Sequence, residues 1–167
     1  MITDTDTGEE YINYRRENGG SYSSYIRELY TGLLLQIREH CTRLERYGSK
    51  QAERVLARIE ETWQDEPEHL WEKYPANAVF RRRDNQKWYA LTGKVPLNKV
   101  RKESSSTREV QILNLHADKQ RVRELLSREG IYEAWHMNKQ TWFTIIFDDV
   151  LDDEQIFSLI SESYQSV

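Results

Sequence analysis

Apolar residues recur every three or four positions along the first part of the chain, a spacing typical of amphipathic helices. The first series starts after Ser21 and ends at Gly48, because a glycine can terminate a helix. Its members are Tyr22, Ile26, Leu29, Leu33, Ile37, Cys41, Leu44 and Tyr47. A second series runs from Ser49 to Trp63, and a proline that cannot continue a helix follows it. We therefore predict a long helix over residues 21–48 and a shorter one over residues 49–63.

Beyond these helices the period changes to two, which is typical of strands. "NAVFRRR" and "QKWYALTGKV" predict a hairpin that turns at Asp84-Asn85, because both residue types tolerate positive φ. "EVQILNL" is the next predicted strand, and the charged, serine-rich residues 98–108 before it are expected to form a mobile loop. Two further strands are predicted around Asn138–Gln140, the second over Trp142 to Phe147.

Two more helices are predicted from their ends. Asp118 can cap a short helix, for which Gly130 would be the C-terminal glycine. Asp152 and Gln155 have the spacing of a capping box, in which each side chain bonds the backbone N–H of the other residue. The last helix should therefore start at Asp152 and extend to about Tyr164.

The order of these elements predicts an α+β fold, in which helices pack on one face of an antiparallel sheet and an extra N-terminal helix precedes them. Residues 1–20 are polar, and we expect a flexible tail without a core. The expected organisation is thus a tail, a helical extension over 21–48 and an α+β domain over 49–167.

Composition narrows the class of protein. Of the 167 residues 38% are hydrophobic and 31% are charged, and no apolar run approaches the roughly 18 residues of a membrane span. The first residues lack the basic and apolar regions of a signal peptide, so we expect a cytoplasmic protein without membrane contact. A net charge of −4 argues against a protein that coats nucleic acid over its whole surface. The single cysteine, Cys41, excludes an internal disulfide and is expected to be a small core residue.

Catalytic motifs are missing from the sequence. It contains no phosphate-binding glycine loop, no "HExxH" and no Gly-x-Ser-x-Gly. Its four histidines, His40, His69, His116 and His136, are far apart, and its carboxylate clusters are explained by solvated faces and helix starts. We therefore expect a protein that is not an enzyme and needs neither cofactor nor metal.

The segment from Val79 to Lys102 is strongly basic, although the whole chain is acidic. Asp84 is the only carboxylate of this segment, and its cations are Arg81, Arg82, Arg83, Lys87, Lys94, Lys99, Arg101 and Lys102. With Trp88 and Tyr89 among them, such a hairpin could bind nucleic acid through phosphates and flat side chains. The alternative, which the sequence alone favours slightly, is an edge hairpin kept soluble by charge, with both aromatic residues in the core. Successive arginines on a strand point to opposite faces, so only part of the cluster can act together.

The stretch "HMNK", which begins at His136, also has two interpretations. As a zinc site it lacks ligands, because such a site needs three or four and none is near in sequence. Asn138-Lys139 fits the turn of a hairpin better. His136, Asn138 and Lys139 could still contact a partner from the tip of that hairpin.

The chain resembles the MmcQ/YjbR family, whose fold is similar to that of the bacterial frataxin CyaY. The resemblance covers residues 51–167 and is carried by "EPEHLWEKYPANAVFRRRDNQKWYAL", "EVQILNL" and "GIYEAWHMNKQTWFTIIFDDVLDDEQIFSLISESYQSV". It implies DNA binding by two hairpins that act as a pair of wings. Here the wings would be Arg81 to Tyr89 and Trp135 to Trp142. The likeness to frataxin points to Glu53, Glu60 and Glu61 for iron, although Arg54 and Arg58 interrupt this acidic row.

The leading hypothesis is weak, mainly phosphate-directed binding of double-stranded DNA by the basic hairpins. The alternative is a protein-interaction module that pairs residues 22–47 with a second copy or with another protein. Metal binding like that of frataxin is a third hypothesis.

Overall fold

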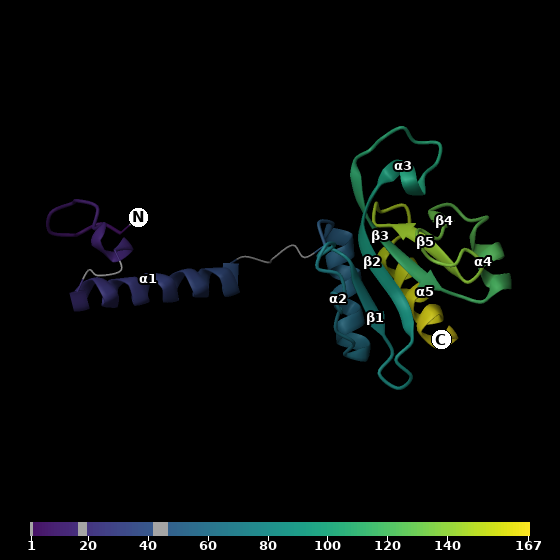
Figure 1. Cartoon of the computed structure of the whole chain (residues 1–167), viewed down its shortest axis with the longest axis horizontal. Helices are drawn as coiled ribbons and strands as arrows, with labels where there is room; N and C mark the ends of the chain where they lie inside the picture. The colour runs from purple at the N-terminus through teal and green to yellow at the C-terminus, as the bar shows by residue number, and fades with distance from the viewer. Residues whose placement is uncertain (1, 17–19, 42–46) are drawn as a thin grey trace. The chain divides into compact units, whose positions relative to one another are not determined.

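The computed structural model describes residues 2–16, 20–41 and 47–167, with no side-chain description for residues 38–41. The chain divides into two compact units, residues 1–44 and 45–167, which are considered separately. The N-terminal unit contains η1 (Asn13–Arg15) and α1 (Gly20–Cys41). The second unit contains α2 (Lys50–Trp63), β1 (Ala78–Arg81), β2 (Trp88–Pro96), α3 (Leu97–Val100), β3 (Glu109–His116), α4 (Lys119–Leu125), β4 (Ile131–Glu133), β5 (Trp142–Ile146) and α5 (Asp153–Ser166) (Figure 1).

The strands of the second unit form one five-stranded sheet in the order β1-β2-β3-β5-β4, and every neighbouring pair is antiparallel. β2 and β3 pair over the longest stretch, from Ala90 opposite Leu115 to Pro96 opposite Glu109. A bulge between Phe80 and Arg81 shifts the register of β1 against β2. The predicted α+β class and its antiparallel sheet are thus confirmed.

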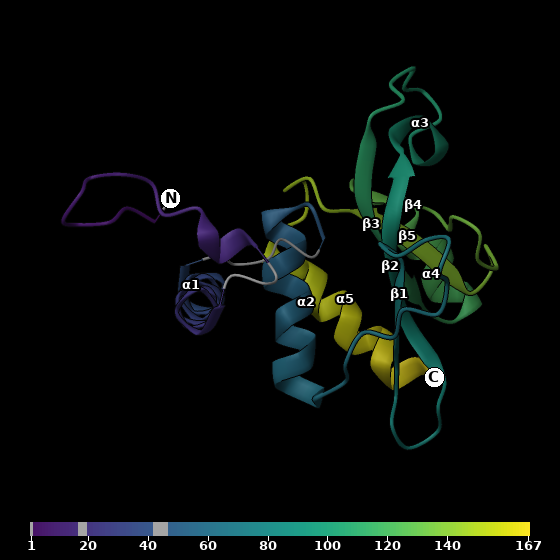
Figure 2. The same ribbon diagram turned by 60° about the vertical axis from the view of Figure 1, so that its left-hand side comes forward.

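Helices α2 and α5 lie on the same side of the sheet, which we call the inner face (Figure 2). The main core forms there from Val55, Leu56 and Ile59 of α2, Ile156 and Ile160 of α5, and strand residues such as Leu113 and Phe143. α4 adds Val122 and Leu125 to the same core. Burial of these large side chains is the main source of stability for a domain of this size.

The opposite side of the sheet, the outer face, carries a smaller core. Val95, Val110, Ile112 and Ile146 pack there with Leu97 and Val100 of α3, and Tyr132 and Trp135 pack against them. Among the described residues of the second unit, no long helix covers this face (Figure 2). It therefore leaves partly exposed aromatic residues next to a thin apolar layer.

Three predicted helices are confirmed, with small shifts at their ends. Ser49 caps α2 by accepting from Ala52 N, and Asp118 caps α4 by accepting from Gln120 N and Arg121 N. The Asp152–Gln155 capping box is present, and α5 continues to Ser166. α4 ends at Leu125, so Gly130 lies beyond it and precedes β4.

The predicted first helix needs a correction at its C-terminal end. α1 spans Gly20–Cys41, and the expected helical residue Leu44 lies outside the described residues, as does the side chain of Cys41. Tyr47 is not helical and is buried in the main core of the second unit. Tyr47 fitted the apolar spacing of the first helix by coincidence. Periodicity in the sequence does not show in which hydrophobic core a residue is buried.

Two predicted loops also differ. The first hairpin turns over Arg82 to Lys87, closed by Arg82 N donating to Lys87 O, and positive φ falls on Gln86 instead of Asp84-Asn85. The mobile loop expected over residues 98–108 begins inside helix α3. Leu97 N donates to Arg108 O and Asn98 N donates to Ser106 O, so backbone bonds hold this segment together.

Residues 2–16 do not lack packing, in contrast to the core-free tail expected from their polarity. Tyr14 is buried, and its ring meets Tyr30 of α1 edge-on at 5.2 Å between centroids. Arg27 Nε donates to Tyr14 O, and Tyr11 Oη is hydrogen-bonded to Ser23 Oγ.

No described helix in either unit is long and apolar enough to cross a membrane.

Candidate functional site

The arginines of the first hairpin are engaged by carboxylates. Arg81 Nε lies 3.0 Å from Glu68 Oε2, and Arg82 Nη2 lies 2.6 Å from Asp84 Oδ2. Arg83 Nε lies 3.5 Å from Oδ1 of the buried Asp65. Each arginine therefore has an acidic partner, and their capacity to bind phosphate is lower than the sequence suggests.

The hairpin arginines also point to different surfaces, as the alternation of a strand requires. The Arg81 guanidinium stacks over Trp88, 5.3 Å from the ring centroid, towards the outer face. The Arg82 guanidinium lies 4.6 Å from the Tyr164 ring centroid and donates to Tyr164 O, which ties the hairpin to the end of α5. These contacts give both side chains a role in packing.

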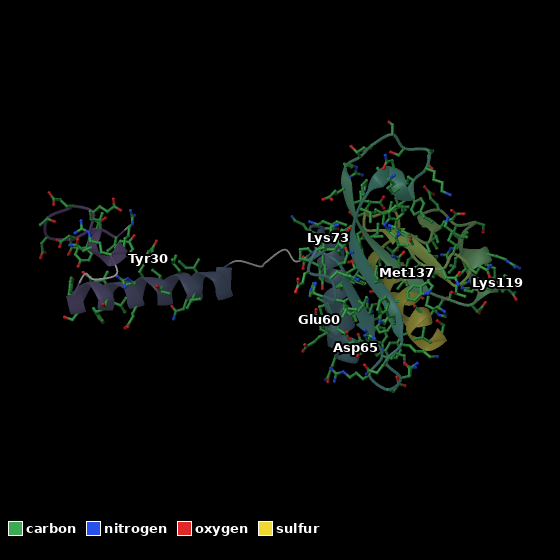
Figure 3. All side chains as sticks on the ribbon, in the orientation of Figure 1. Tyr30, Glu60, Asp65, Lys73, Lys119 and Met137 are labelled. Carbon is green, nitrogen blue, oxygen red and sulfur yellow. The ribbon has the colours of Figure 1, made fainter. Side chains whose placement is uncertain are left out.

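Asp65 is a buried carboxylate just beyond the C-terminal end of α2 (Figure 3). It accepts a 3.0 Å hydrogen bond from the Tyr89 hydroxyl. Burial raises the pKa of Asp65, although this hydrogen bond and the charge of Arg83 act in the opposite direction. Burial and the Asp65 carboxylate raise the pKa of Tyr89, so its phenol stays protonated and donates. No sequence pattern predicts this pair, because Asp65 and Tyr89 are 24 residues apart in the chain.

The second hairpin folds back over the sheet. Asn138 begins the predicted turn, since its Oδ1 accepts from Gln140 N and its carbonyl accepts from Thr141 N. Upstream of that turn, Trp135 N donates to Thr144 Oγ1 at 2.9 Å, and Trp135 O accepts from Asn114 Nδ2 at 3.3 Å. Asn114 and Thr144 are fully buried partners across β3 and β5. They hold residues 134–137 against the outer face, so this segment is not a free wing.

An aromatic groove of about 660 Å³ lies on the outer face. Val95 and Ile112 lie on its floor, and its lining also includes Trp71, Tyr74, Trp88, Trp135, His136 and Met137. Trp71 meets Trp88 edge-on with centroids 6.0 Å apart. The absence of a side chain at Gly93 admits Asn77, whose Cγ would lie 2.9 Å from a Cβ there. The result is an open slot with flat, partly exposed walls.

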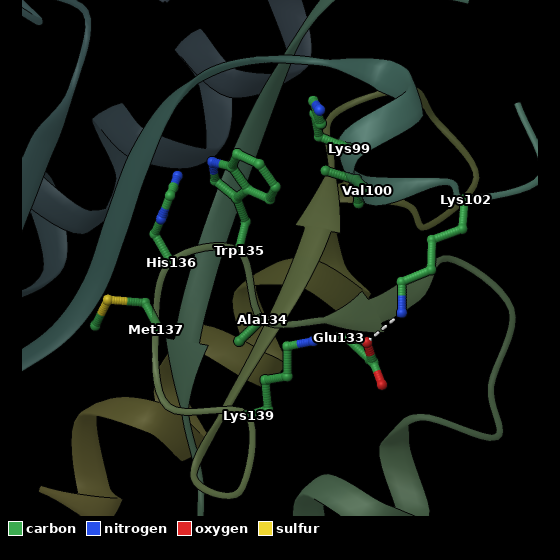
Figure 4. Close-up of a pocket in the computed structure, with 9 residues that line it drawn as sticks. All are labelled: Lys99, Val100, Lys102, Glu133, Ala134, Trp135, His136, Met137 and Lys139. Carbon is green, nitrogen blue, oxygen red and sulfur yellow. Dashed lines mark hydrogen bonds and ion pairs between the residues drawn. The ribbon is translucent and has the colours of Figure 1, made fainter. Parts of the chain in front are cut away.

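A lysine cluster adjoins this groove (Figure 4). A second pocket, of about 340 Å³, is lined by Lys99, Lys102 and Lys139 and shares Trp135, His136 and Met137 with the aromatic groove. Lys102 Nζ lies 2.6 Å and Lys139 Nζ 3.0 Å from the same oxygen of Glu133. Hydrogen bonds from both lysines lower the pKa of Glu133. Two ammonium groups thus share one carboxylate, and the ammonium of Lys99 in the same pocket has no ion pair among the described residues.

The remaining predicted residues are dispersed. Arg101 bonds Asp148 and the Tyr132 hydroxyl, which anchors α3 to the sheet. Lys94 belongs to the groove lining, but its ammonium reaches Gly48. Lys87 lies exposed at the β1–β2 turn. The structure therefore brings together Lys99, Lys102, His136 and Lys139, with Trp88 along the groove and Asn138 in the adjoining turn.

Sequence reasoning missed Trp71, Tyr74, Asn114 and Thr144. Trp71 and Tyr74 lie in an irregular segment in which no periodicity exists to assign a face. Asn114 and Thr144 occupy strand positions where a polar residue is buried, and a buried polar residue needs a partner. That rule could have marked them once the strands were aligned.

No metal centre forms among the residues whose side chains are described, because they contain no group of three or more His, Cys, Asp or Glu placed to hold an ion. On α2, Arg54 pairs with Asp153 and Arg58 with Glu154 of α5. The hypothesis of frataxin-like metal binding gains no support from these residues. His40 lies outside them.

The geometry defines a small antiparallel α+β domain with an aromatic and basic outer face. The sequence model of the YjbR family matches residues 53–166, and the chain belongs to this family. The uncharacterized protein YyaQ of Bacillus subtilis strain 168 is 30% identical over 112 residues, which cover 67% of this chain and 93% of that protein. The family resemblance of the sequence is thus confirmed.

Solved structures agree with this assignment. A crystal structure of a Pseudomonas syringae protein has a TM-score of 0.64 at 35% identity and covers 68% of this chain and 95% of that one. A solution NMR structure from Pseudomonas syringae has a TM-score of 0.61 at 35% identity and covers 68% and 89%. The residues that the family model matches, 53–166, lie within the second unit, which is therefore called the family domain.

Proposed function

We propose that the family domain binds DNA weakly, without a chemical step, through the lysine cluster. The observation that carries this proposal is that Lys99, Lys102 and Lys139 line one pocket, in which Glu133 pairs with Lys102 and Lys139 and no described carboxylate pairs with Lys99, which leaves excess positive charge at one place. Exposed ammonium groups of this kind bind phosphates and release counterions. This keeps the DNA-binding hypothesis drawn from the sequence and moves its site.

The paired arginines are the reason for moving the site. Arg82 and Arg83 each have a carboxylate of their own within ion-pair distance, for which a phosphate would have to compete. Lys102 and Lys139 share a single carboxylate, that of Glu133. Lys99 has no ion pair among the described residues and lies exposed beside Trp135. Phosphate contacts of this type position a protein on DNA without reading its sequence. Binding should therefore depend little on base sequence.

Two matched triple variants test where DNA binds. One carries Lys99→Gln, Lys102→Gln and Lys139→Gln, and the other carries Arg81→Gln, Arg83→Gln and Lys87→Gln. Fluorescence anisotropy at low salt would measure the affinity for labelled 12-mer DNA, both duplex and single-stranded. The lysine variant should lose at least about tenfold in affinity, because three phosphate contacts are removed. A larger loss in the arginine variant would return the site to the hairpin, and no binding by the wild type would refute the proposal.

Self-association through α1 is a second candidate function, favoured by the exposure of its apolar residues. Among the side chains of this helix that the structure describes, residues 20–37, seven large apolar ones are exposed, and Leu29 and Leu33 are exposed by 54% and 53%. An apolar surface of this kind is typical of a helix that binds a partner. Sedimentation of the full chain would test a dimer, and Leu29→Gln with Leu33→Gln should convert it to a monomer. Ser24→Gln with Thr31→Gln is the control, and a monomeric wild type would contradict self-association.

A further inference from the structure

We infer that the aromatic groove takes unpaired bases, so that the DNA bound by this domain is single-stranded. The inference rests on the proposed function and adds a second contact to it. The groove and the lysine cluster share Trp135, His136 and Met137, so one ligand can reach both. Its part in the groove must be flat and uncharged, and its part over the lysines must be anionic.

The walls of the groove suit the faces of bases. Tyr74 is 53% exposed, and Trp71, Trp88 and Trp135 are each partly exposed around the same opening. Aromatic side chains stack on any base, and each such contact contributes to affinity independently of sequence. The groove volume lies in the usual range for pockets that enclose a small ligand, about 300–1,000 Å³. One or two bases would therefore fit without opening the fold.

The charges of the groove favour a base over a charged ligand. Within the lining, Lys94 directs its ammonium to Gly48 instead of the slot, and Glu109 lies at the end of β3. Cations surround the groove instead: Lys73 Nζ lies 5.6 Å from the Tyr74 ring centroid at one side, and the lysine cluster adjoins Trp135. A neutral base between two phosphates has this distribution of charge.

Other ligands match the site less well. Bases in a duplex are stacked inside the helix, so a duplex can reach the lysines but cannot place a base between Tyr74 and Trp71. A proline-rich peptide could occupy an aromatic groove, but it has no anion for the lysine cluster. Single-stranded nucleic acid is the ligand that uses both halves of the surface.

The test compares ligands and groove variants by tryptophan fluorescence and anisotropy on the full chain. A single-stranded 12-mer of thymidines should quench tryptophan fluorescence and bind more tightly than a 12-base-pair duplex. Tyr74→Ala, which removes an exposed side chain, and Trp71→Ala should each lower the affinity for the single strand by at least about fivefold. Leu126→Ala, which shortens an exposed apolar side chain at the end of α4 outside both pockets, is the control and should have no effect. Circular dichroism would verify that each variant is folded.

Each other outcome has a defined meaning. If the duplex and the single strand bind equally and Tyr74→Ala is silent while the lysine variant loses affinity, the groove inference is wrong and the proposed function stands. If no DNA binds, both are wrong. If thymidine monophosphate binds as tightly as the 12-mer, the inference of a single strand is wrong and the ligand is a free nucleotide. Quenching by decaproline with no effect of the 12-mer would overturn the inference in favour of a peptide.

Discussion

At the scale of single residues, a basic side chain that the sequence suggests for ligand binding can already be paired with a carboxylate in the fold. Arg81, Arg82 and Arg83 are basic in the sequence, but each meets a carboxylate in the fold. Glu68 and Asp65 lie more than ten positions upstream of the arginines that they bind, so no local pattern reveals these pairs. Lys99 is available to a ligand because no described carboxylate lies within ion-pair distance. Lys99, Lys102 and Lys139 were therefore predicted only as part of a longer list of candidate DNA-binding residues.

Gly93 is a residue whose importance depends on a close contact. Gly93→Ala should destabilise the domain by about 1–3 kcal/mol, because the new Cβ would lie 2.9 Å from Asn77 Cγ. Urea unfolding would measure this change. In an Asn77→Ala background the same substitution should cost much less, because the opposing side chain is gone. Equal costs in both backgrounds would show that Asn77 is not the cause.

His116 should make stability depend on pH. Burial, and then the charge of Lys87, lowers its pKa below the ordinary value of 6.5, with Asp118 opposing. Below pH 6.5 the unfolded chain therefore binds a proton that the folded chain does not, and the free energy of unfolding should decrease as the pH falls. Urea unfolding at pH 7.5, 6.5 and 5.5 would measure this slope. His116→Gln should reduce it and the exposed His69→Gln should not, so an unchanged slope in His116→Gln would reject the assignment.

At the scale of elements, local signals predicted well what local bonds decide. The Asp152–Gln155 capping box and the stripe of α2 were read from short stretches, and both are present. The segment 134–137 was not predicted to lie over the sheet, because its anchors come from β3 and β5. Asn114 is 21 residues from Trp135, to which it donates. The sequence of a loop shows no hydrophobic periodicity when the loop is held on the sheet by residues of other strands.

The anchor of that segment can be tested with substitutions of nearly constant volume. Thr144→Val removes the hydroxyl that accepts from Trp135 N and donates to Asn114 Oδ1, so buried groups lose their partners. The free energy of unfolding should fall by about 1–3 kcal/mol. Amide exchange at Trp135 should accelerate as well. Thr144→Ser keeps the hydroxyl and should protect Trp135 better than Val does, and the reverse order would disprove the role of the hydroxyl.

At the scale of the whole molecule, the acidic net charge and the local basic surface have different consequences. The net charge of −4 weakens attraction to nucleic acid at long range, so contact must depend on the lysine cluster at short range. The sequence predicts the α+β class from the order and spacing of its elements, and the family from the stretches that resemble it. It does not predict the continuous surface of groove and cluster, which four separate segments form: 71–77, 88–102, 109–112 and 133–139.

The salt dependence of binding measures how many lysines of this surface contact phosphate. For a single strand the slope of log K against log salt is about −0.7 per contact, so three lysines predict a slope of about −2. Lys99→Gln alone should bring the slope to about −1.4, because one contact is removed. Tyr74→Ala should weaken binding with the slope unchanged, since stacking releases few counterions. Anisotropy titrations over a series of salt concentrations would separate the two effects, and a slope near zero in the wild type would show that the lysines do not bind phosphate.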